Sequence, residues 1–108
     1  MHLLGAGKGG VLAIAAYRDK HFQGYALRTP DGWLCVCSLG MGWSKLRAQT
    51  AEDARMTLRT TSHAARFENL RDVDELVSAI NKMPPYQRPG ILPQDIAGFP
   101  AKLPKLVS

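Results

Sequence analysis

The first part of the chain alternates between apolar runs and short polar turns, which is typical of a β-meander. An unbroken apolar run at 11–17 ends at the polar turn 18–21, and further apolar runs follow at 24–29 and 33–37. A Pro-Asp-Gly tripeptide separates the last two runs. Proline presets the first turn dihedral and glycine accepts a positive φ, so this tripeptide predicts a β-hairpin.

The next stretch is glycine-rich and then polar. Residues 39–43 are interrupted by glycines, which predicts a loop, and a further strand is predicted from 45 to 49. Thr50 is followed by two acidic residues at 52 and 53. This arrangement resembles a helix cap with an acidic first turn, so we expect a short helical turn there.

Residues 55–61 alternate, with Met56 and Leu58 on one face and arginines on the other. Alternation with a period of two is typical of a half-buried strand, and here it predicts a strand whose solvent-facing side is basic. A last strand is predicted at 64–68, with Phe67 facing inward. The pattern therefore favours a sheet of four or five strands.

One helix is predicted at about 70–83, because apolar residues recur there at helical spacing. The stripe consists of Leu70, Val73, Leu76, Val77 and Ile80. We expect Asn69 to cap this helix, with the acidic residues at 72, 74 and 75 near its positive N-terminal end. Two consecutive prolines at 84 and 85 end it, because proline disfavours the helical conformation of the residue before it.

The last part of the chain, 84–108, differs in composition from the rest. It holds six of the seven prolines, interleaved with large apolar residues. A disordered tail is usually poorer in such residues. We therefore expect an extended arm that packs on its own domain or on a partner, and a single domain over 1–83 with a glycine-rich lead-in at 1–10.

The predicted fold class is α+β, with an antiparallel sheet, one covering helix and the proline-rich arm. The order of strands followed by a helix over 11–83 is similar to the topology of the PC4-like and Whirly-type single-stranded DNA-binding domains. The resemblance concerns the fold alone, since shared topology does not establish shared function. One helix leaves the other sheet face open to solvent, a ligand or a second copy, so we expect a homodimer formed through the helix or the arm.

Composition and charge exclude several classes of protein. The apolar content is that of an ordinary globular domain, and the two cysteines are too few for a disulfide scaffold or a four-cysteine zinc module. We expect no secretory signal, no bilayer-spanning segment and a cytoplasmic location. The net charge is +5. Residues 1–71 hold ten basic and five acidic side chains, whereas 72–108 hold four of each, so the excess lies on the sheet portion.

No motif predicts catalysis, a cofactor or a metal site. Residues 5–10 match G-x-G-x-x-G, but only four residues precede the first glycine and a helix is not predicted after the motif, so we expect a glycine-rich lead-in rather than a nucleotide site. Cys35 and Cys37 are separated by one residue, so they lie on the same side of a predicted strand, and they lack the ligand spacing of zinc sites. No nucleophile-elbow sequence surrounds a serine, and helix capping explains the clustered acids. We therefore expect a binding protein rather than an enzyme.

Two functional hypotheses follow. In the first, a basic sheet face binds nucleic acid, with single-stranded DNA favoured, because basic side chains neutralise phosphates and exposed aromatics stack on bases. The residues expected to bind nucleic acid are Arg28, Trp43, Lys45, Arg47, Arg55, Arg59 and Arg66. In the second, the protein is a protein-binding accessory or inhibitor, of the kind that mobile genetic elements encode, and acts through 84–108 and an exposed patch.

Overall fold

The computed structural model describes residues 11–40 and 42–96. In chain order, the elements are β1 (Ala13–Arg18), β2 (His21–Thr29), β3 (Gly32–Leu39), β4 (Gly42–Ala48), α1 (Ala51–Ser62), β5 (Arg66–Leu70) and α2 (Val73–Asn81), followed by 3-10 turns at Pro85–Gln87 and Pro93–Asp95. The predicted lead-in at 1–10 and the part of the predicted arm at 97–108 lie outside the described residues.

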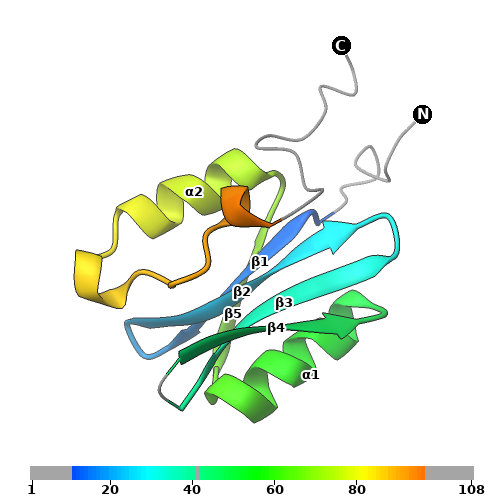
Figure 1. The fold of residues 1–108 in the computed structure, drawn as a ribbon, viewed down its shortest axis with the longest axis horizontal. Coiled ribbons are helices and arrows are strands. Elements are labelled where there is room, and N and C mark those ends of the chain that lie inside the picture. The colour runs from blue at the N-terminus through cyan, green and yellow to red at the C-terminus, as the bar shows by residue number, and fades with distance from the viewer. Residues whose placement is uncertain (1–10, 41, 97–108) are drawn as a thin grey trace.

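The five strands form one antiparallel sheet in the order β4-β3-β2-β1-β5 (Figure 1). The predicted α+β class is confirmed, and α2 lies within the range predicted for the covering helix. The Pro-Asp-Gly hairpin is also confirmed, because β2 ends at Thr29 and β3 starts at Gly32. Within the described part of the chain, no helix is long and apolar enough to cross a membrane.

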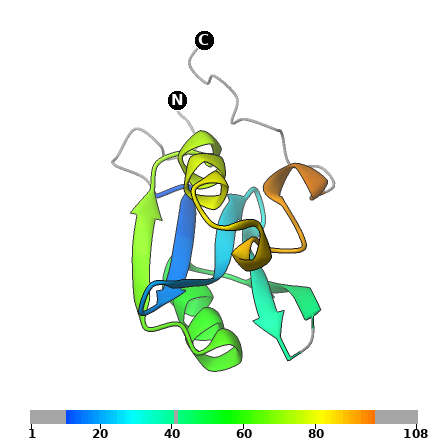
Figure 2. The ribbon, with the colours of Figure 1, turned by 90° about the vertical axis from the view of Figure 1, so that its left-hand side faces the viewer.

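Helices cover both faces of the sheet (Figures 1 and 2). The α2 side buries Ala13, Ala15, Tyr17, Phe22, Tyr25, Leu27, Leu34 and Val36 of the sheet with Val73, Leu76, Ile80 and Ile96. The α1 side buries Ile14, Ala16, Ala26, Trp33, Cys35 and Cys37 with Ala54, Leu58 and Ala64. Double coverage explains why the apolar runs of the central strands are continuous rather than alternating. The expectation of an open sheet face was therefore wrong.

The second helix, α1, replaces the strand that alternation predicted at 55–61, and that prediction was wrong. The predicted cap is real, because the Thr50 hydroxyl accepts a hydrogen bond of 3.0 Å from the backbone N–H of Asp53. Beyond this cap the helix continues to Ser62 and buries Ala54 and Leu58. The buried positions recur every four residues, which is a helical spacing.

Three predicted boundaries also move. Asp72 caps α2 instead of Asn69, and its side chain accepts a 2.9 Å hydrogen bond from the N–H of Glu75. Asn69 and Leu70 belong to β5. The strand predicted from 45 onward begins at Gly42, and β3 extends to Leu39, so most of the predicted glycine-interrupted loop belongs to the two strands.

Residues 85–96 lie on the α2 side and are held by their own domain. The buried hydroxyl of Tyr25 donates a 2.6 Å hydrogen bond to the carbonyl of Ile91. Burial raises the pKa of this hydroxyl far above its usual range, so it remains a donor at all ordinary pH values. Ile96 joins the α2-side core, and the Arg88 guanidinium donates to the carbonyls of Asn81 and Met83 at the end of α2.

The two cysteines are free and buried on the α1 side of β3. Burial, together with the neighbouring Cys37, raises the pKa of the Cys35 thiol to about 12, and burial also raises the pKa of Cys37. The thiolate is the reactive form, so a raised pKa suppresses alkylation.

We expect the Cys35 thiol of the native protein to react with iodoacetamide at about pH 8 about 1000-fold more slowly than a cysteine in a short peptide. The Cys37 thiol should also react more slowly than the peptide. The measurement is mass spectrometry over a labelling time course. In denaturant both thiols should react at the peptide rate, which serves as the control. Rapid labelling of the folded protein would contradict the buried placement.

Candidate nucleic-acid interface

The sequence predicted seven binding residues on one face, and the structure separates them into groups. Trp43, Lys45 and Arg47 lie on the edge strand β4 and form what we call the β4 strip. Their Cα partners on β3 include Leu34 and Val36, which face the α2-side core. Directly opposite residues of paired strands share a face, so the β4 strip projects on the α2 side of the sheet.

Within the β4 strip, the two cations are exposed and the tryptophan is half-buried. Neither Lys45 nor Arg47 has a carboxylate within 4.0 Å among the described residues. Trp43 packs against Gly90, where an added Cβ would come within 2.9 Å of the indole Cδ1. The 85–96 segment therefore covers part of the indole, and Trp43 is a partly exposed platform rather than a fully open one.

Arg55 and Arg59 occupy one flank of α1, which we call the α1 strip. The Arg55 guanidinium contacts the carboxylate of Glu52 at 3.3 Å and donates to the side-chain oxygen of Asn69 at 3.0 Å. The Arg59 guanidinium lies over the Phe67 ring, 5.4 Å from its centroid. Both arginines therefore sit on the α1 side, beside β5.

The remaining two predicted residues lie apart from these strips. Arg28 is half-buried near the end of β2, opposite Trp33 of the α1-side core. Arg66 is exposed at the start of β5, on the α2 side, with its guanidinium 4.3 Å from the centroid of the Tyr17 ring. β5 and β4 are opposite edges of the sheet, so Arg66 and the β4 strip do not meet.

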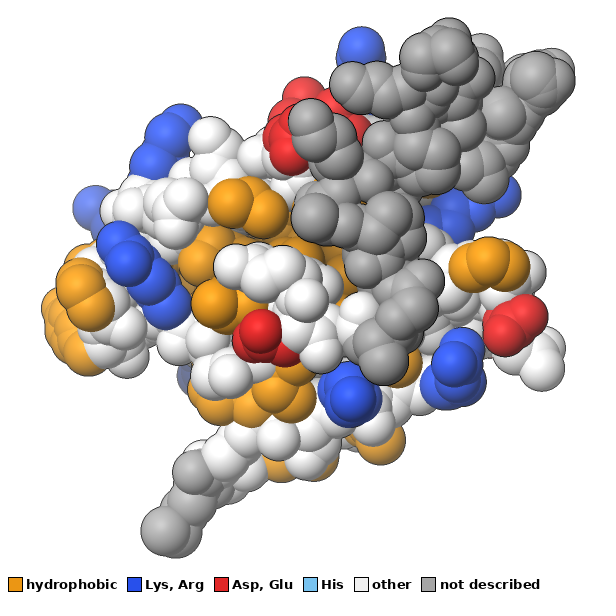
Figure 3. Space-filling model, turned by 45° about the horizontal axis from the view of Figure 1, so that its top comes forward, with side chains coloured by type: hydrophobic (Ala, Val, Ile, Leu, Met, Phe, Trp, Pro, Cys, Tyr) orange, Lys and Arg blue, Asp and Glu red, His pale blue; other side chains and the backbone are white. Residues whose placement is uncertain are grey.

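The prediction of a single basic sheet face was therefore wrong. Its physical premise was a strand at 55–61 beside other basic strands, whereas that segment is a helix that covers part of the sheet. Figure 3 shows that Lys and Arg side chains are dispersed over the face it presents, with acidic side chains between them. What the structure does bring together is the β4 strip on one side and the α1 strip on the other.

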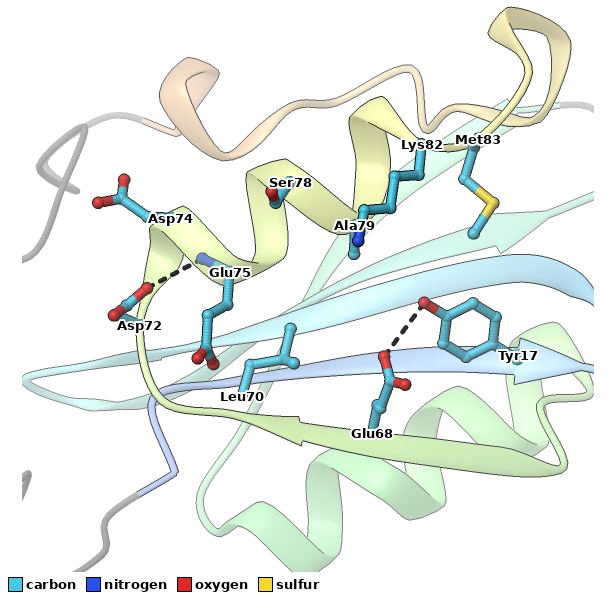
Figure 4. Close-up of a pocket in the computed structure, with 10 residues that line it drawn as sticks. All are labelled: Tyr17, Glu68, Leu70, Asp72, Asp74, Glu75, Ser78, Ala79, Lys82 and Met83. Carbon is cyan, nitrogen blue, oxygen red and sulfur yellow. Dashed lines mark hydrogen bonds between the residues drawn. The ribbon is translucent and has the colours of Figure 1, made fainter.

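An acidic pocket of about 770 Å³ lies between α2 and β5, and sequence reasoning missed it (Figure 4). Its lining residues are Tyr17, Glu68, Leu70, Asp72, Asp74, Glu75, Ser78, Ala79, Lys82 and Met83. The clustered acids were visible in the sequence, but helix capping explained them. That explanation holds for Asp72, and Glu75 accepts a 2.7 Å hydrogen bond from the backbone N–H of Arg71.

Tyr17 and Glu68, which also line this pocket, are partners of each other. The Tyr17 hydroxyl contacts the Glu68 carboxylate at 3.4 Å, and burial, together with the charge of Glu68, raises the pKa of Tyr17. Among the described residues, no three histidine, cysteine or acidic side chains are grouped to hold a metal ion. The pocket's main consequence is electrostatic, because it places negative charge at the β5 edge and away from the β4 strip.

The element order also differs from the uninterrupted strands-then-helix order of the PC4-like and Whirly-type domains, because α1 precedes β5. Searches with this chain found no matching family model, no matching curated protein and no matching solved structure.

Proposed function

We propose that the protein binds nucleic acid, with single-stranded DNA favoured, and that the β4 strip is the main contact. The observation that carries the proposal is the exposure of Lys45 and Arg47, side by side on an edge strand, with no described carboxylate to neutralise them. Cations that are not paired within the protein attract phosphates and release the counterions condensed on them.

The spacing of the two cations supports a strand of nucleic acid as the ligand. Side chains two residues apart on a β-strand are separated by about 7 Å. Phosphates along one strand of stacked nucleotides advance by about 3.4 Å, so two such side chains match phosphates two steps apart. Trp43 lies on the same side of β4, where the exposed part of its indole is available to a base.

The arrangement of charge supports approach from the β4 edge. The carboxylates of the acidic pocket lie at the other edge of the sheet, so a polyanion is repelled there and attracted to the β4 strip. Such a separation of charge orients a ligand during its approach. The α1 strip lies on the opposite side of the sheet and offers a second, separate contact.

The expected result is that a fluorescent single-stranded oligonucleotide binds the wild-type protein with an affinity that falls steeply with salt. The K45A/R47A variant should bind at least about tenfold more weakly at low salt, because two phosphate contacts are lost. The slope of log affinity against log salt should shrink by about 1.4, which is about 0.7 for each contact. Fluorescence anisotropy over a salt series measures both quantities.

A matched control is the R18A/K20A variant, which removes the same charge from the exposed β1–β2 turn. It should bind nearly as well as the wild type. An equal loss in both variants would remove the assignment to the β4 strip. Absence of salt-dependent binding in the wild type would remove the proposed function itself. A duplex competitor of the same length tests the preference for single strands.

The alternative of a protein-binding accessory receives less support from the described structure. It requires an arm that is available to a partner, but residues 85–96 pack on their own domain through Tyr25, Trp43 and the α2-side core. Under this alternative, contact with a partner would fall to 97–108 or to another surface.

A further inference from the structure

The outer edge of β5 carries an unusual order of side chains. Register with β1 puts Arg66 opposite Tyr17 and Glu68 opposite Ala15, so both charges lie on the α2 side. Phe67, between them, lies on the α1 side and is half-buried. The strand therefore reads positive, aromatic, negative. Both charged residues are exposed.

This edge has no partner within the described structure. β5 is the last strand of the sheet, and no described segment lies outside it in Figure 2. The backbone N–H and C=O groups on the outer side of β5 can therefore form hydrogen bonds with another strand. Helix α1 packs mainly on β2, β3 and β4. It reaches β5 through the side chains of Arg55 and Arg59, which contact the side chains of Asn69 and Phe67.

The order positive, aromatic, negative is self-complementary about its centre. When two copies of β5 pair antiparallel with Phe67 opposite the partner's Phe67, Arg66 lies opposite the partner's Glu68. The same pair repeats on the other side of the two-fold axis, so one strand supplies two opposite-charge pairs and an aromatic pair. Pairs of both kinds stabilise antiparallel strands.

We propose that β5 is the dimerisation edge of this protein, where it pairs antiparallel with β5 of a second copy about Phe67. The two sheets then form one continuous sheet with two-fold symmetry, the commonest symmetry of homo-oligomers. This inference goes beyond the proposed function and does not depend on it. It also differs from the sequence-based expectation, which placed a dimer contact on the helix or the arm.

The opposite edge is not suited to the same role. In β4, Lys45 and Arg47 lie on the α2 side, and Leu46 between them lies on the α1 side. The order of side chains along this strand is therefore positive, apolar, positive. Pairing two copies of β4 about Leu46 would place like charges opposite each other twice, which is destabilising. Lysine and arginine on an edge strand are a common device against such pairing. The two edges thus differ in charge order, and only β5 complements itself.

Dimerisation would also bring the α1 strips of both copies together. Arg59 lies over Phe67, so the two Phe67 rings at the two-fold axis carry one Arg59 each. Arg55 lies one helical turn away on the same flank and contacts Asn69 of β5. The dimer therefore places the α1 strips of the two copies near each other on its α1 side. Their mutual repulsion is screened by salt or by a bound polyanion.

The test uses charge reversal on the full chain. Sedimentation velocity over a concentration series should show a reversible dimer of the wild type. R66E gives the edge two acids and E68R gives it two bases, so each should weaken dimerisation at least about tenfold. An equimolar mixture of R66E and E68R should recover dimers, because each acid then faces a base. The double variant R66E/E68R should dimerise nearly as well as the wild type.

A second measurement tests the register without relying on charge. In the proposed register, F67C places the thiol of one copy directly opposite the same thiol of the second copy, so an intermolecular disulfide should form under mild oxidation. N69C should not form one, because the two thiols at position 69 are four residues apart along the strands. Circular dichroism confirms that each variant is folded. A wild type that is monomeric throughout, single variants that dimerise normally, or a mixture that does not recover would each overturn the proposal. Concentration-dependent growth beyond a dimer, as expected for β4 pairing with β5, would overturn it too.

Discussion

Gly24→Ala is expected to lower the free energy of unfolding by about 3–5 kcal/mol, because it combines backbone strain with a steric clash. Gly24 lies inside β2 at φ +153°, a conformation that side chains with a Cβ rarely adopt. A Cβ built there would lie 2.4 Å from the carbonyl oxygen of Val36 and 3.1 Å from Cδ2 of Leu58. The oxygen belongs to the backbone of β3 and has no room to move.

Urea denaturation measures this loss, and two other glycines provide matched controls. Gly42→Ala, at a position where nothing lies within 4 Å, should change stability by less than about 0.5 kcal/mol. Gly40→Ala meets only the strain of φ +55°, so it should cost about 1 kcal/mol. A Gly24 variant as stable as the Gly42 variant would show that β2 and β3 do not approach as closely as described.

The sequence predicted those elements whose signals are local. The hairpin at 30–32 was readable because turn residues carry their own conformational preference. The α2 helix was readable because its stripe of large apolar residues is long enough to show helical spacing. Gly24 shows the limit of this reasoning. It was taken as the first residue of a strand, whereas β2 begins at His21 and places Gly24 inside the sheet beside the bulge in the β1–β2 pairing.

The proposed binding surface could not be located from the sequence, because it depends on which strands lie at the edges of the sheet. Pairing of β1 with β5 joins residues more than fifty positions apart, such as Ala13 and Leu70, and no local pattern reports it. One signal was available for β4. Lysine and arginine alternate within it around Leu46, a pattern typical of edge strands, and it separates β4 from the apolar central strands.

The failure at α1 has a different cause, which is the small size of its buried residues. The helix contacts the sheet through Ala54, Leu58 and Ser62, so only one large apolar residue marks the buried stripe. Met56 happens to lie two residues before Leu58 and creates an apparent alternation. Because this segment holds few large apolar residues, the apparent alternation was clearer than the helical spacing of the buried positions.

Leu58→Ala and Met56→Ala distinguish the helix from the strand that alternation predicted. In a strand both side chains would face the core and both substitutions would be costly. In the structure Leu58 is fully buried against the sheet, whereas Met56 is 51% exposed. Leu58→Ala is therefore expected to lower the free energy of unfolding by about 2–5 kcal/mol, and Met56→Ala by less than about 0.5 kcal/mol.

The comparison is matched, because both substitutions remove a large apolar side chain from the same helix and leave alanine, which favours helices. The Leu58 side chain packs over Gly24, which has no side chain of its own. Loss of Leu58 therefore leaves a cavity between α1, β2 and β3, and neighbouring side chains cannot fill it without moving the backbone of the sheet. Urea denaturation of the two variants gives the difference directly. Equal losses of stability in the two variants would favour a strand at 55–61 over α1. The placement of Arg55 and Arg59 on one flank of a helix would then be wrong as well.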